Sequence, residues 1–379
     1  MAVALVRAGF WLQHASNEAE QLLTFADELG QTAAGRPGVA LGPVNVPKAL
    51  NAHFQRARRA GDAILDPHGQ MLDLDPTKRS EKHFPWLALN QRPATQVQWQ
   101  QWMQQALDHQ LSAVLRGSAP PPSFVMTASP RMQAARGALE LYPVLDAATE
   151  VTAQVPPGTD CWLSASVDRT YLREEPHLTR LANALLATGA NGVVFRASHS
   201  QLPPVDDSRY LHGLREIVQA CAENDVRLYL PNTGWVGWLA MGLGAWGFSG
   251  GMSATSWVDK VASPMRRPEL PSLPYFEHQL LRSVPWRVHE QLVSEPGYQP
   301  CVCADCAAMG ANHDLALAKR HQLRHAHEAG TALSGLPRAQ RRAVVVIRLD
   351  TAIAFRDGLS SAVAARIDGN FLDRWRALV

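Results

Sequence analysis

The stretch Cys301-Val302-Cys303-Ala304-Asp305-Cys306 places three thiols within six residues near the C-terminal end of the chain. Cysteines this close together do not readily pair as disulfides, whereas their thiolates can converge on one tetrahedral zinc ion with an imidazole as the fourth ligand. A closed site of this kind is usually structural, so the motif predicts a small subdomain held together by zinc. Candidates for the fourth ligand follow in a histidine-rich segment: His313, His321, His325 and His327.

The composition of the chain indicates the class of protein to which this motif belongs. The 379 residues suffice for one large domain and a small appendage, and 46% hydrophobic with 18% charged residues describes a well-packed soluble globule. The N-terminus does not read as a signal peptide, and the apolar stretch from Trp235 to Phe248 is broken by glycines and too short to cross a bilayer. We therefore expect a cytoplasmic protein without a membrane partner, in a reducing compartment that keeps its cysteines free for metal. A net charge of +2 means that any nucleic-acid surface is local.

Short β-rich runs alternate with amphipathic helical stretches along the chain, and His177–Thr188 and Tyr210–Asn224 are two of these helices. About eight strands separated by helices favour a (β/α)8 TIM-like barrel over a doubly wound sheet. We predict a barrel catalytic domain over residues 1–270, a zinc-binding subdomain over 271–335 and a C-terminal segment over 336–379 that packs on the barrel. The predicted strands are Val3–Val6, Val39–Gly42, Ala63–Asp66, Phe124–Thr127, Cys161–Val167, Gly192–Ala197, Arg227–Pro231 and Trp246–Gly250.

Polar residues follow several of these strands, and in a barrel the active site lies at the C-terminal ends of the strands. Asp66 ends an apolar strand, a position equally typical of a loop-organising carboxylate. Asp168 precedes a helix, which favours a capping role. Further polar groups at strand ends are His68, Gln70, Ser129, Ser164, Ser166, Arg196, Ser198, Asn232 and Ser249.

With these residues in place, the chain resembles the tRNA-guanine transglycosylase superfamily, which includes enzymes that exchange 7-deazaguanines into DNA. Members are zinc-bearing (β/α)8 barrels with a CxCxxC signature followed by a histidine that begins a His-Asn-Leu-like stretch. Cys301, Cys303 and Cys306 match the thiols, and His321 matches the histidine in His321-Gln322-Leu323-Arg324. The intervening segment is shorter than in the family, so His325 and His313 stay open as alternatives.

The same resemblance assigns roles in the barrel. The run Ile64-Leu65-Asp66-Pro67-His68-Gly69-Gln70 resembles the family's Leu-Thr-Asp-Ser-Gly-Gly-Phe-Gln, which places Asp66 on the acid/base aspartate and Gln70 on the glutamine. Ser249 stands where the family has the aspartate that forms a covalent intermediate with the sugar. A serine without an adjacent base is a poor nucleophile, because its hydroxyl stays protonated. Ser129 and Ser164 match base-reading positions, which implies a larger and differently polar pocket.

One carboxylate without a covalent partner suggests hydrolysis instead of exchange, since a single aspartate can stabilise an oxocarbenium-like state and polarise water. The resemblance therefore implies an N-glycosylase that excises a flipped-out modified base. We expect DNA rather than tRNA as its partner, because base removal suits repair or defence against phages with modified bases. The candidate catalytic residues are Asp66, Asp168 and Ser249, and the candidate nucleotide-binding residues are His68, Gln70, Ser129, Ser164, Arg196 and Asn232.

Two other classes of function stay open from the sequence. One is a transglycosylase whose nucleophile is another carboxylate, Asp168 or Asp259. The other is a non-catalytic nucleic-acid-binding paralogue, a role that some superfamily members have. Superfamily members commonly dimerise through the zinc subdomain, so the resemblance also allows a homodimer. Stacking of a flipped base on tryptophan is a further expectation, with candidates at Trp235, Trp238, Trp246 and Trp257.

Overall fold

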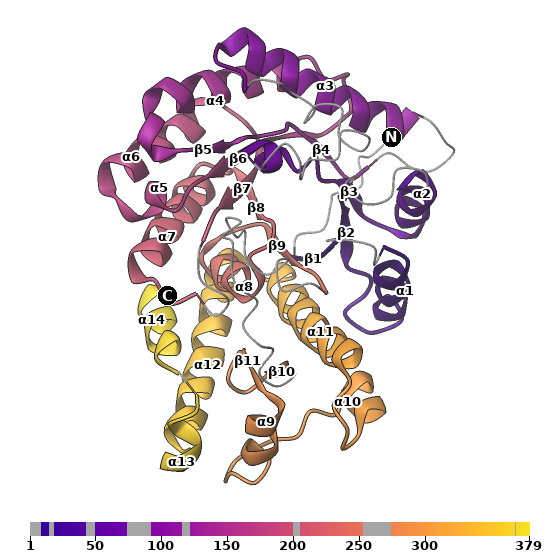
Figure 1. The fold of residues 1–379 in the computed structure, drawn as a ribbon, viewed down its shortest axis with the longest axis vertical. Coiled ribbons are helices and arrows are strands. Elements are labelled where there is room, and N and C mark those ends of the chain that lie inside the picture. Colours follow the sequence, from indigo (N-terminus) through magenta and orange to yellow (C-terminus); the bar gives the residue numbers. More distant parts are fainter. Residues whose placement is uncertain are drawn as a thin grey trace.

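A mostly parallel sheet curls into a barrel with helices on its outside (Figure 1). The computed structural model describes residues 9–14, 19–42, 50–73, 92–115, 122–199, 205–252, 274–367 and 369–379. Around the sheet the strand order is β3-β2-β1-β9-β8-β7-β6-β4, and the short β5 pairs with β6 beyond β4. The barrel strands are β1 (Gly9–Gln13), β2 (Gly38–Leu41), β3 (Ala63–Leu65), β4 (Val125–Met126), β5 (Arg131–Met132), β6 (Cys161–Val167), β7 (Gly192–Ala197), β8 (Arg227–Leu230) and β9 (Gly247–Gly250).

The two edges of the sheet meet at Ser123. Its backbone amide donates to the Ala63 carbonyl oxygen at 3.0 Å, and its hydroxyl accepts from the Ala63 amide at 3.2 Å. These two bonds bring β4 against β3 and nearly close the barrel. The predicted (β/α)8 class is thereby confirmed.

The first barrel strand lies elsewhere than expected. The predicted strand Val3–Val6 falls outside the described residues, and β1 at Gly9–Gln13 takes the place between β2 and β9. This run alternates in a strand-like way, because Phe10 and Leu12 pack outward in the main core while Trp11 faces the aromatic cluster inside the barrel. The other predicted strands are present: β2 begins and ends one residue earlier than predicted, and the rest have shorter or equal bounds.

Helices cover the outside of the barrel, and their starts follow recognisable caps. The two predicted helices begin earlier than expected because Pro176 occupies the first turn of α6 and Asp207 accepts a hydrogen bond from the Tyr210 amide at the start of α7. The barrel helices are α1 (Ala19–Leu29), α2 (Leu50–Ala60), α3 (Gln96–Leu115), α4 (Ala138–Ala153), α5 (Thr170–Arg173), α6 (Glu175–Ala187), α7 (Ser208–Glu223) and α8 (Gly234–Leu243).

An aromatic cluster fills the N-terminal half of the barrel interior. Trp11, Trp162 and Tyr229 belong to it, Trp246 packs against it, and Phe124 stacks on Trp162 with ring centroids 4.2 Å apart. Further along several strands buried polar residues follow: Gln13, Ser164, Ser166, Arg196 and Ser249. The barrel is therefore closed by aromatic packing at one end and lined by polar groups at the other.

The C-terminal third adds a hairpin and six helices, and one of these helices belongs to the barrel wall. α11, an orange helix in Figure 1, packs along β1 and beside α8, where Gly330 lies so close to Phe10 that a Cβ would come within 2.9 Å of the Phe10 Cβ. The elements are β10 (Pro274–Glu277), β11 (Arg282–Pro285), α9 (Trp286–Leu292), α10 (Ala304–Met309), α11 (Leu315–Ser334), α12 (Arg338–Asp357), α13 (Ser361–Ala364) and α14 (Asn370–Leu378).

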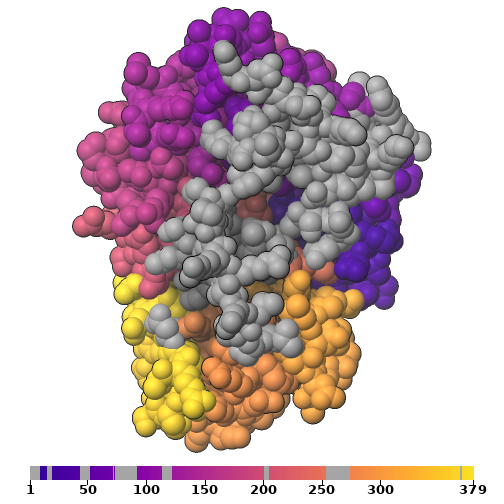
Figure 2. All heavy atoms as spheres, in the orientation of Figure 1, coloured from indigo at the N-terminus to yellow at the C-terminus, as the bar shows by residue number. Residues whose placement is uncertain are grey.

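The hairpin and these helices form one end of the molecule. In Figure 2 the yellow C-terminal helices lie beside the dark orange segment that contains α9, and the Glu295 carboxylate accepts hydrogen bonds from the amide and hydroxyl of Ser360. Among the described residues, none of the helices combines the length and apolar character that a membrane crossing demands.

Candidate functional site

A buried ion pair stands at the polar end of the barrel. Asp66, just after β3, and Arg196, on β7, approach to 2.5 Å, and each side chain is 1% exposed. Arg196 also donates to the Ser164 hydroxyl on β6 at 3.4 Å. Three of the residues predicted from strand ends are thus brought together inside the barrel.

The carboxylate of Asp66 is held as an anion. Its Oδ2 accepts from Arg196 and from the Gln13 side-chain amide at 3.2 Å, and its Oδ1 accepts from the His68 backbone amide at 3.0 Å. Burial alone would raise the pKa of this carboxyl, but the charge of Arg196, the His68 ring and these hydrogen bonds hold the pKa below its usual range. A carboxylate has about four acceptor positions, so these residues leave one position on Oδ1.

Ser249, on β9, completes a chain of contacts across the barrel. Its hydroxyl accepts from the Asn232 backbone amide at 2.9 Å and donates to the Gln13 side-chain oxygen at 3.2 Å. Both neighbours are neutral amide groups, and Asn232 takes a left-handed backbone conformation with φ of 58° to reach this position. Ser249 therefore links β1 to β9 with an un-ionised hydroxyl.

His68 and Gln70 flank the carboxylate. The His68 Nε2 lies 3.9 Å from the Asp66 Oδ2, and His68 also has a left-handed backbone, with φ of 49°. Its ring packs against Gly42. A Cβ added to Gly42 would lie 2.3 Å from the His68 Nε2, so a larger residue there would displace the ring. Gln70 lies on the 3₁₀ turn Gly69–Asp73 and is buried, with its side-chain oxygen lacking a hydrogen bond among the described residues.

The Ser129 hydroxyl is hydrogen-bonded to the protein backbone instead of facing a ligand. Its hydroxyl accepts from the Ser166 amide at 3.0 Å, and the Thr127 hydroxyl accepts from the Ser164 amide at 2.9 Å. These oxygens stand in for backbone carbonyls where the chain after β4 leaves the regular ladder. The side chain expected to bind a base is instead part of the β4–β6 connection.

Asp168 organises a loop outside this network. Its Oδ1 accepts from the Thr170 amide and its Oδ2 from the Ala134 amide, both at 2.8 Å. The carboxylate joins the end of β6 to the turn after β5, which matches the capping role favoured by the sequence. The other alternative nucleophile, Asp259, lies outside the described residues.

The tryptophans expected to stack on a base are core residues. Trp246 packs among the aromatic rings at the opposite, N-terminal end of the barrel. Trp235 and Trp238 lie on α8 outside the barrel, and Trp235 stacks on Phe276 with centroids 4.8 Å apart. Their apolar surface drives packing of α8 and the hairpin, while Trp257 falls outside the described residues.

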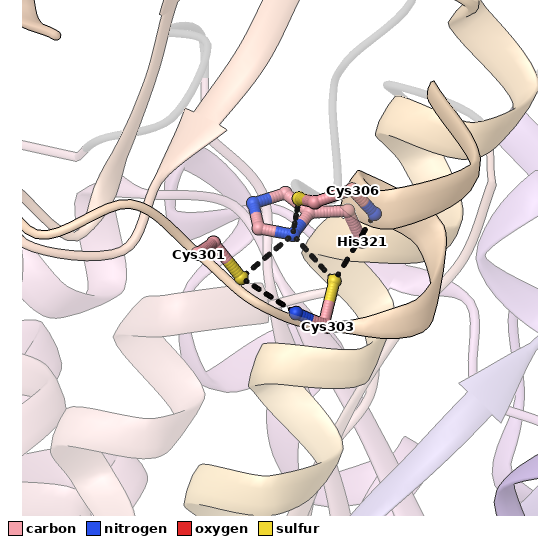
Figure 3. A group of neighbouring side chains, drawn as sticks. All are labelled: Cys301, Cys303, Cys306 and His321. Atoms are coloured by element: carbon pink, nitrogen blue, oxygen red, sulfur yellow. Dashed lines mark hydrogen bonds between the residues drawn. The ribbon is translucent and has the colours of Figure 1, made fainter. Parts of the chain in front are cut away.

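A cluster of metal-ligand residues lies where α10 meets α11. One ligand atom from each of Cys301, Cys303, Cys306 and His321 lies within 4.8 Å of every other, so the group could hold a metal ion, and three sulfurs with one nitrogen suit zinc (Figure 3). The Nδ1 of His321 is 3.8, 3.4 and 3.2 Å from the three sulfurs in chain order. This is the histidine that the sequence placed first.

Neighbouring groups orient the ligands. The His321 Nε2 lies 2.8 Å from the Phe276 carbonyl oxygen, which makes Nε2 the protonated nitrogen and leaves the Nδ1 lone pair for a metal. The Cys306 amide donates to the Cys303 sulfur at 3.4 Å, and the Tyr275 hydroxyl lies 3.1 Å from the Cys306 sulfur. Donors to sulfur stabilise thiolate charge, the form of cysteine that binds a metal.

Of the remaining candidate ligands, His313 lies apart from this group and His325 contacts one of its members. His313 contacts the Pro274 carbonyl oxygen at 3.2 Å, and His325 reaches Cys301 alone among the three motif sulfurs.

The two cysteines outside the motif are not metal ligands. Burial raises the pKa of the Cys161 and Cys221 thiols to about 12, so both thiols are protonated.

Gln13 is a member of the network that strand-end reasoning missed. It is 1% exposed and contacts both Asp66 and Ser249. The signal was present in Gly9-Phe-Trp-Leu-Gln13, where alternation puts Gln13 on the same face as Trp11. Placing the first strand at Val3–Val6 hid this alternation.

The fold and site define the chain as a parallel α/β barrel with a cysteine–histidine metal-ligand cluster. No family model and no curated protein matches the sequence. Among solved structures, the chain is similar to a crystal structure of type I 3-dehydroquinate dehydratase from Clostridium difficile with covalently modified comenic acid. That match has 9% identity and a TM-score of 0.35 over 66% of this chain and 86% of the dehydratase, too weak a likeness to bear on activity.

Proposed function

We propose that this protein is an N-glycosylase that removes a modified base from DNA by hydrolysis, on a barrel remotely related to the tRNA-guanine transglycosylases. The proposal rests on two groups that both contact Gln13: one ionised carboxylate, Asp66, and one hydroxyl, Ser249, whose partners are neutral. The first supports charge stabilisation, and the second argues against a covalent sugar intermediate.

In this mechanism the Asp66 anion stabilises positive charge that develops on the sugar as the N-glycosidic bond breaks. The base departs with the bonding electron pair, and water adds to the sugar carbon from the side of the carboxylate. The remaining acceptor position on the Asp66 Oδ1 orients that water. The proton that the water loses balances the proton that the departing base gains.

Unsatisfied polar atoms near the carboxylate support a ligand at this end of the barrel. The side-chain oxygens of Gln70 and Asn232 are both buried and lack hydrogen bonds among the described residues. Buried acceptors without partners are costly, and a bound base would supply donors. Because a stacked base cannot reach into a barrel, the target nucleotide has to be flipped out.

We further propose that the Cys301, Cys303, Cys306 and His321 group holds one zinc ion and that the protein works in the cytoplasm, where thiols stay reduced. When bound, the ion supplies a cross-link between α10 and α11, and it takes no part in the reaction. Repair, or defence against phages with modified bases, is the process that base removal would serve.

The test is release of free base from DNA with modified and with ordinary bases, measured by mass spectrometry for the wild type, Asp66→Asn and Asp168→Asn. We expect the release seen with the wild type to fall by about 10²–10³-fold in Asp66→Asn, since one preorganised electrostatic group contributes that much. Asp168→Asn should keep release, because that carboxylate caps backbone amides.

Three results would contradict this function. Activity that survives loss of Asp66 would remove the mechanism. A trapped covalent adduct, or incorporation of labelled guanine into tRNA or DNA, would restore the transglycosylase alternative. Tight nucleic-acid binding without release of any base would identify a binding paralogue.

A further inference from the structure

We propose a second metal-binding site beside the first, in which the Cys301 sulfur bridges two ions and His278 and His325 are the other protein ligands. One ligand atom from each of these three residues lies within 4.8 Å of the other two. Cys301 belongs to both groups, whereas the two histidines belong to the second alone. The arrangement is therefore two overlapping sites that share one thiolate.

His325 is oriented as a ligand. It follows His321 by one helical turn on α11, so both rings face the same side of the helix. Its Nε2 lies 3.2 Å from the Cys301 sulfur, and its Nδ1 faces the Glu328 carboxylate at 3.7 Å. Nitrogen and sulfur ligands of one tetrahedral zinc ion are separated by roughly 3.6 Å, given bonds of about 2.0 and 2.3 Å. A carboxylate behind a ligating imidazole is the usual way to fix its orientation.

His278 completes the second group from a different element. It lies in the turn after β10, and its ring centroid lies 5.2 Å from that of His325. Two imidazoles on one tetrahedral ion have centroids about 5 Å apart, by the same bond lengths. The Nδ1 of His278 is buried and has no hydrogen-bond partner among the described residues. A metal ion would satisfy that nitrogen.

Charge also favours a second cation. Three thiolates outweigh the two charges of one zinc ion, so the first site keeps a negative excess. Arg348 opposes the second ion, since its guanidinium donates to the His278 carbonyl oxygen at 3.2 Å. The second ion should therefore bind more weakly than the first. One sulfur and two nitrogens suit a borderline-soft divalent ion and leave one position open to water or an exchangeable ligand.

The test is a metal titration of the full-length protein with Cd²⁺ or Co²⁺, in which bound ions per chain are counted by native mass spectrometry. We expect two ions on the wild type, and ¹¹³Cd spectra with two resonances, one for a site rich in sulfur and one for a site rich in nitrogen. His278→Gln should bind one ion and keep the sulfur-rich resonance. His313→Gln, in the same region but separate from both groups, should bind two.

Other numbers of bound ions per chain would contradict the second site without affecting the first. A wild type that binds one ion at every concentration has no second site. One ion whose Co²⁺ spectrum changes in His325→Gln but not in His278→Gln would make His325 an alternative ligand of the first site. Two ions on both the wild type and His278→Gln would place the second ion elsewhere. Should His278→Gln fail to fold, the count and resonances of the wild type decide alone.

Discussion

At the scale of single residues, Asp66 and Arg196 form a buried ion pair in which each charge depends on the other for its stability. Two opposite charges, each 1% exposed, are stable together because each offsets the desolvation of the other. Removal of one partner leaves an uncompensated charge in a place with little solvent. The pair should therefore be far more sensitive to substitution than the ion pairs on the surface.

Arg196→Gln should lower the free energy of unfolding by about 3–5 kcal/mol at neutral pH, because it leaves the Asp66 carboxylate buried and unpaired. Without Arg196, burial dominates and raises the pKa of Asp66, so folding takes up a proton and the variant gains stability as pH falls. In the wild type this pKa is depressed, so its contribution persists in mild acid and is lost only as pH falls through the depressed value. Urea unfolding of both proteins between pH 8 and pH 5 measures the difference between their free energies of unfolding. We expect this difference to become smaller as the pH falls.

Arg374→Gln is the matched control, since Arg374 pairs with Asp206 at 2.8 Å on the surface, where its side chain is 43% exposed. It should cost less than about 1 kcal/mol at any pH in this range. A gap between Arg196→Gln and wild type that stays constant with pH would mean that Asp66 is not the group left unpaired. The double variant Asp66→Asn with Arg196→Gln should be less destabilised than the sum of the two single variants.

At the scale of secondary-structure elements, the connection from β4 to β6 depends on side chains. Hydroxyls of Thr127 and Ser129 accept from the amides of Ser164 and Ser166 where backbone carbonyls would serve in a regular ladder. The sequence assigned Ser129 to base binding because Ser129 follows a strand and matches a base-reading position of the transglycosylase superfamily. The assignment could not be separated from a structural one, since the divergence of two neighbouring strands leaves no local sequence signature.

Ser129→Ala should lower the free energy of unfolding by about 1–3 kcal/mol, because the buried Ser166 amide loses its acceptor. Thr127→Val should have a similar effect through Ser164. Ser112→Ala, which removes a hydroxyl bonded within α3, should stay within about 0.5 kcal/mol. Chemical denaturation measures all three. A fall in base release without any loss of stability in Ser129→Ala would return Ser129 to the binding site.

The strands were predictable to the extent that their apolar runs were continuous. Gly192–Ala197 and Cys161–Val167 have the predicted bounds because both faces of a parallel barrel strand are covered, which makes these runs apolar or small apart from Arg196. The prediction omitted β1 at Gly9–Gln13 because the nearby Val3–Val6, which lies outside the described residues, reads as equally strand-like. The Arg196–Asp66 contact was likewise out of reach, since it joins residues 130 positions apart. The metal ligands were predictable because their spacing is local.

At the scale of the whole molecule, α11 joins the metal-ligand cluster to the barrel. The helix carries His321, its Arg324 pairs with the buried Asp305 of α10 at 2.7 Å, and its Gly330 packs on Phe10 of β1. A little further along, the His327 Nε2 lies 2.7 Å from the Gly35 carbonyl oxygen. The cluster and the first barrel strand are thus held by the same element, so they should not be independent in stability.

Removal of the metal, by a chelator or by Cys303→Ala, should therefore destabilise the side of the barrel that contacts α11, which is the side of β1. Metal-binding free energy is lost from the folded state, and even a few kcal/mol lowers the melting temperature by roughly 5–10 °C in a chain of this size. Hydrogen exchange measured by mass spectrometry should show lost protection first at Cys301–His321, then along α11 and into β1. β6 and β7, which lie across the barrel, should keep their protection.

Cys161→Ala is the control for cysteine loss, since Cys161 is distant from the cluster and should leave metal content and exchange unchanged. If the cluster opens while β1 keeps full protection, α11 is held by its barrel contacts alone and the metal serves only its own subdomain. If protection is lost uniformly around the barrel, the metal acts on global stability rather than through α11. Graded loss that is strongest at β1 is the outcome that the packing of Gly330 against Phe10 requires, because among the described barrel strands β1 makes the most extensive contact with that helix.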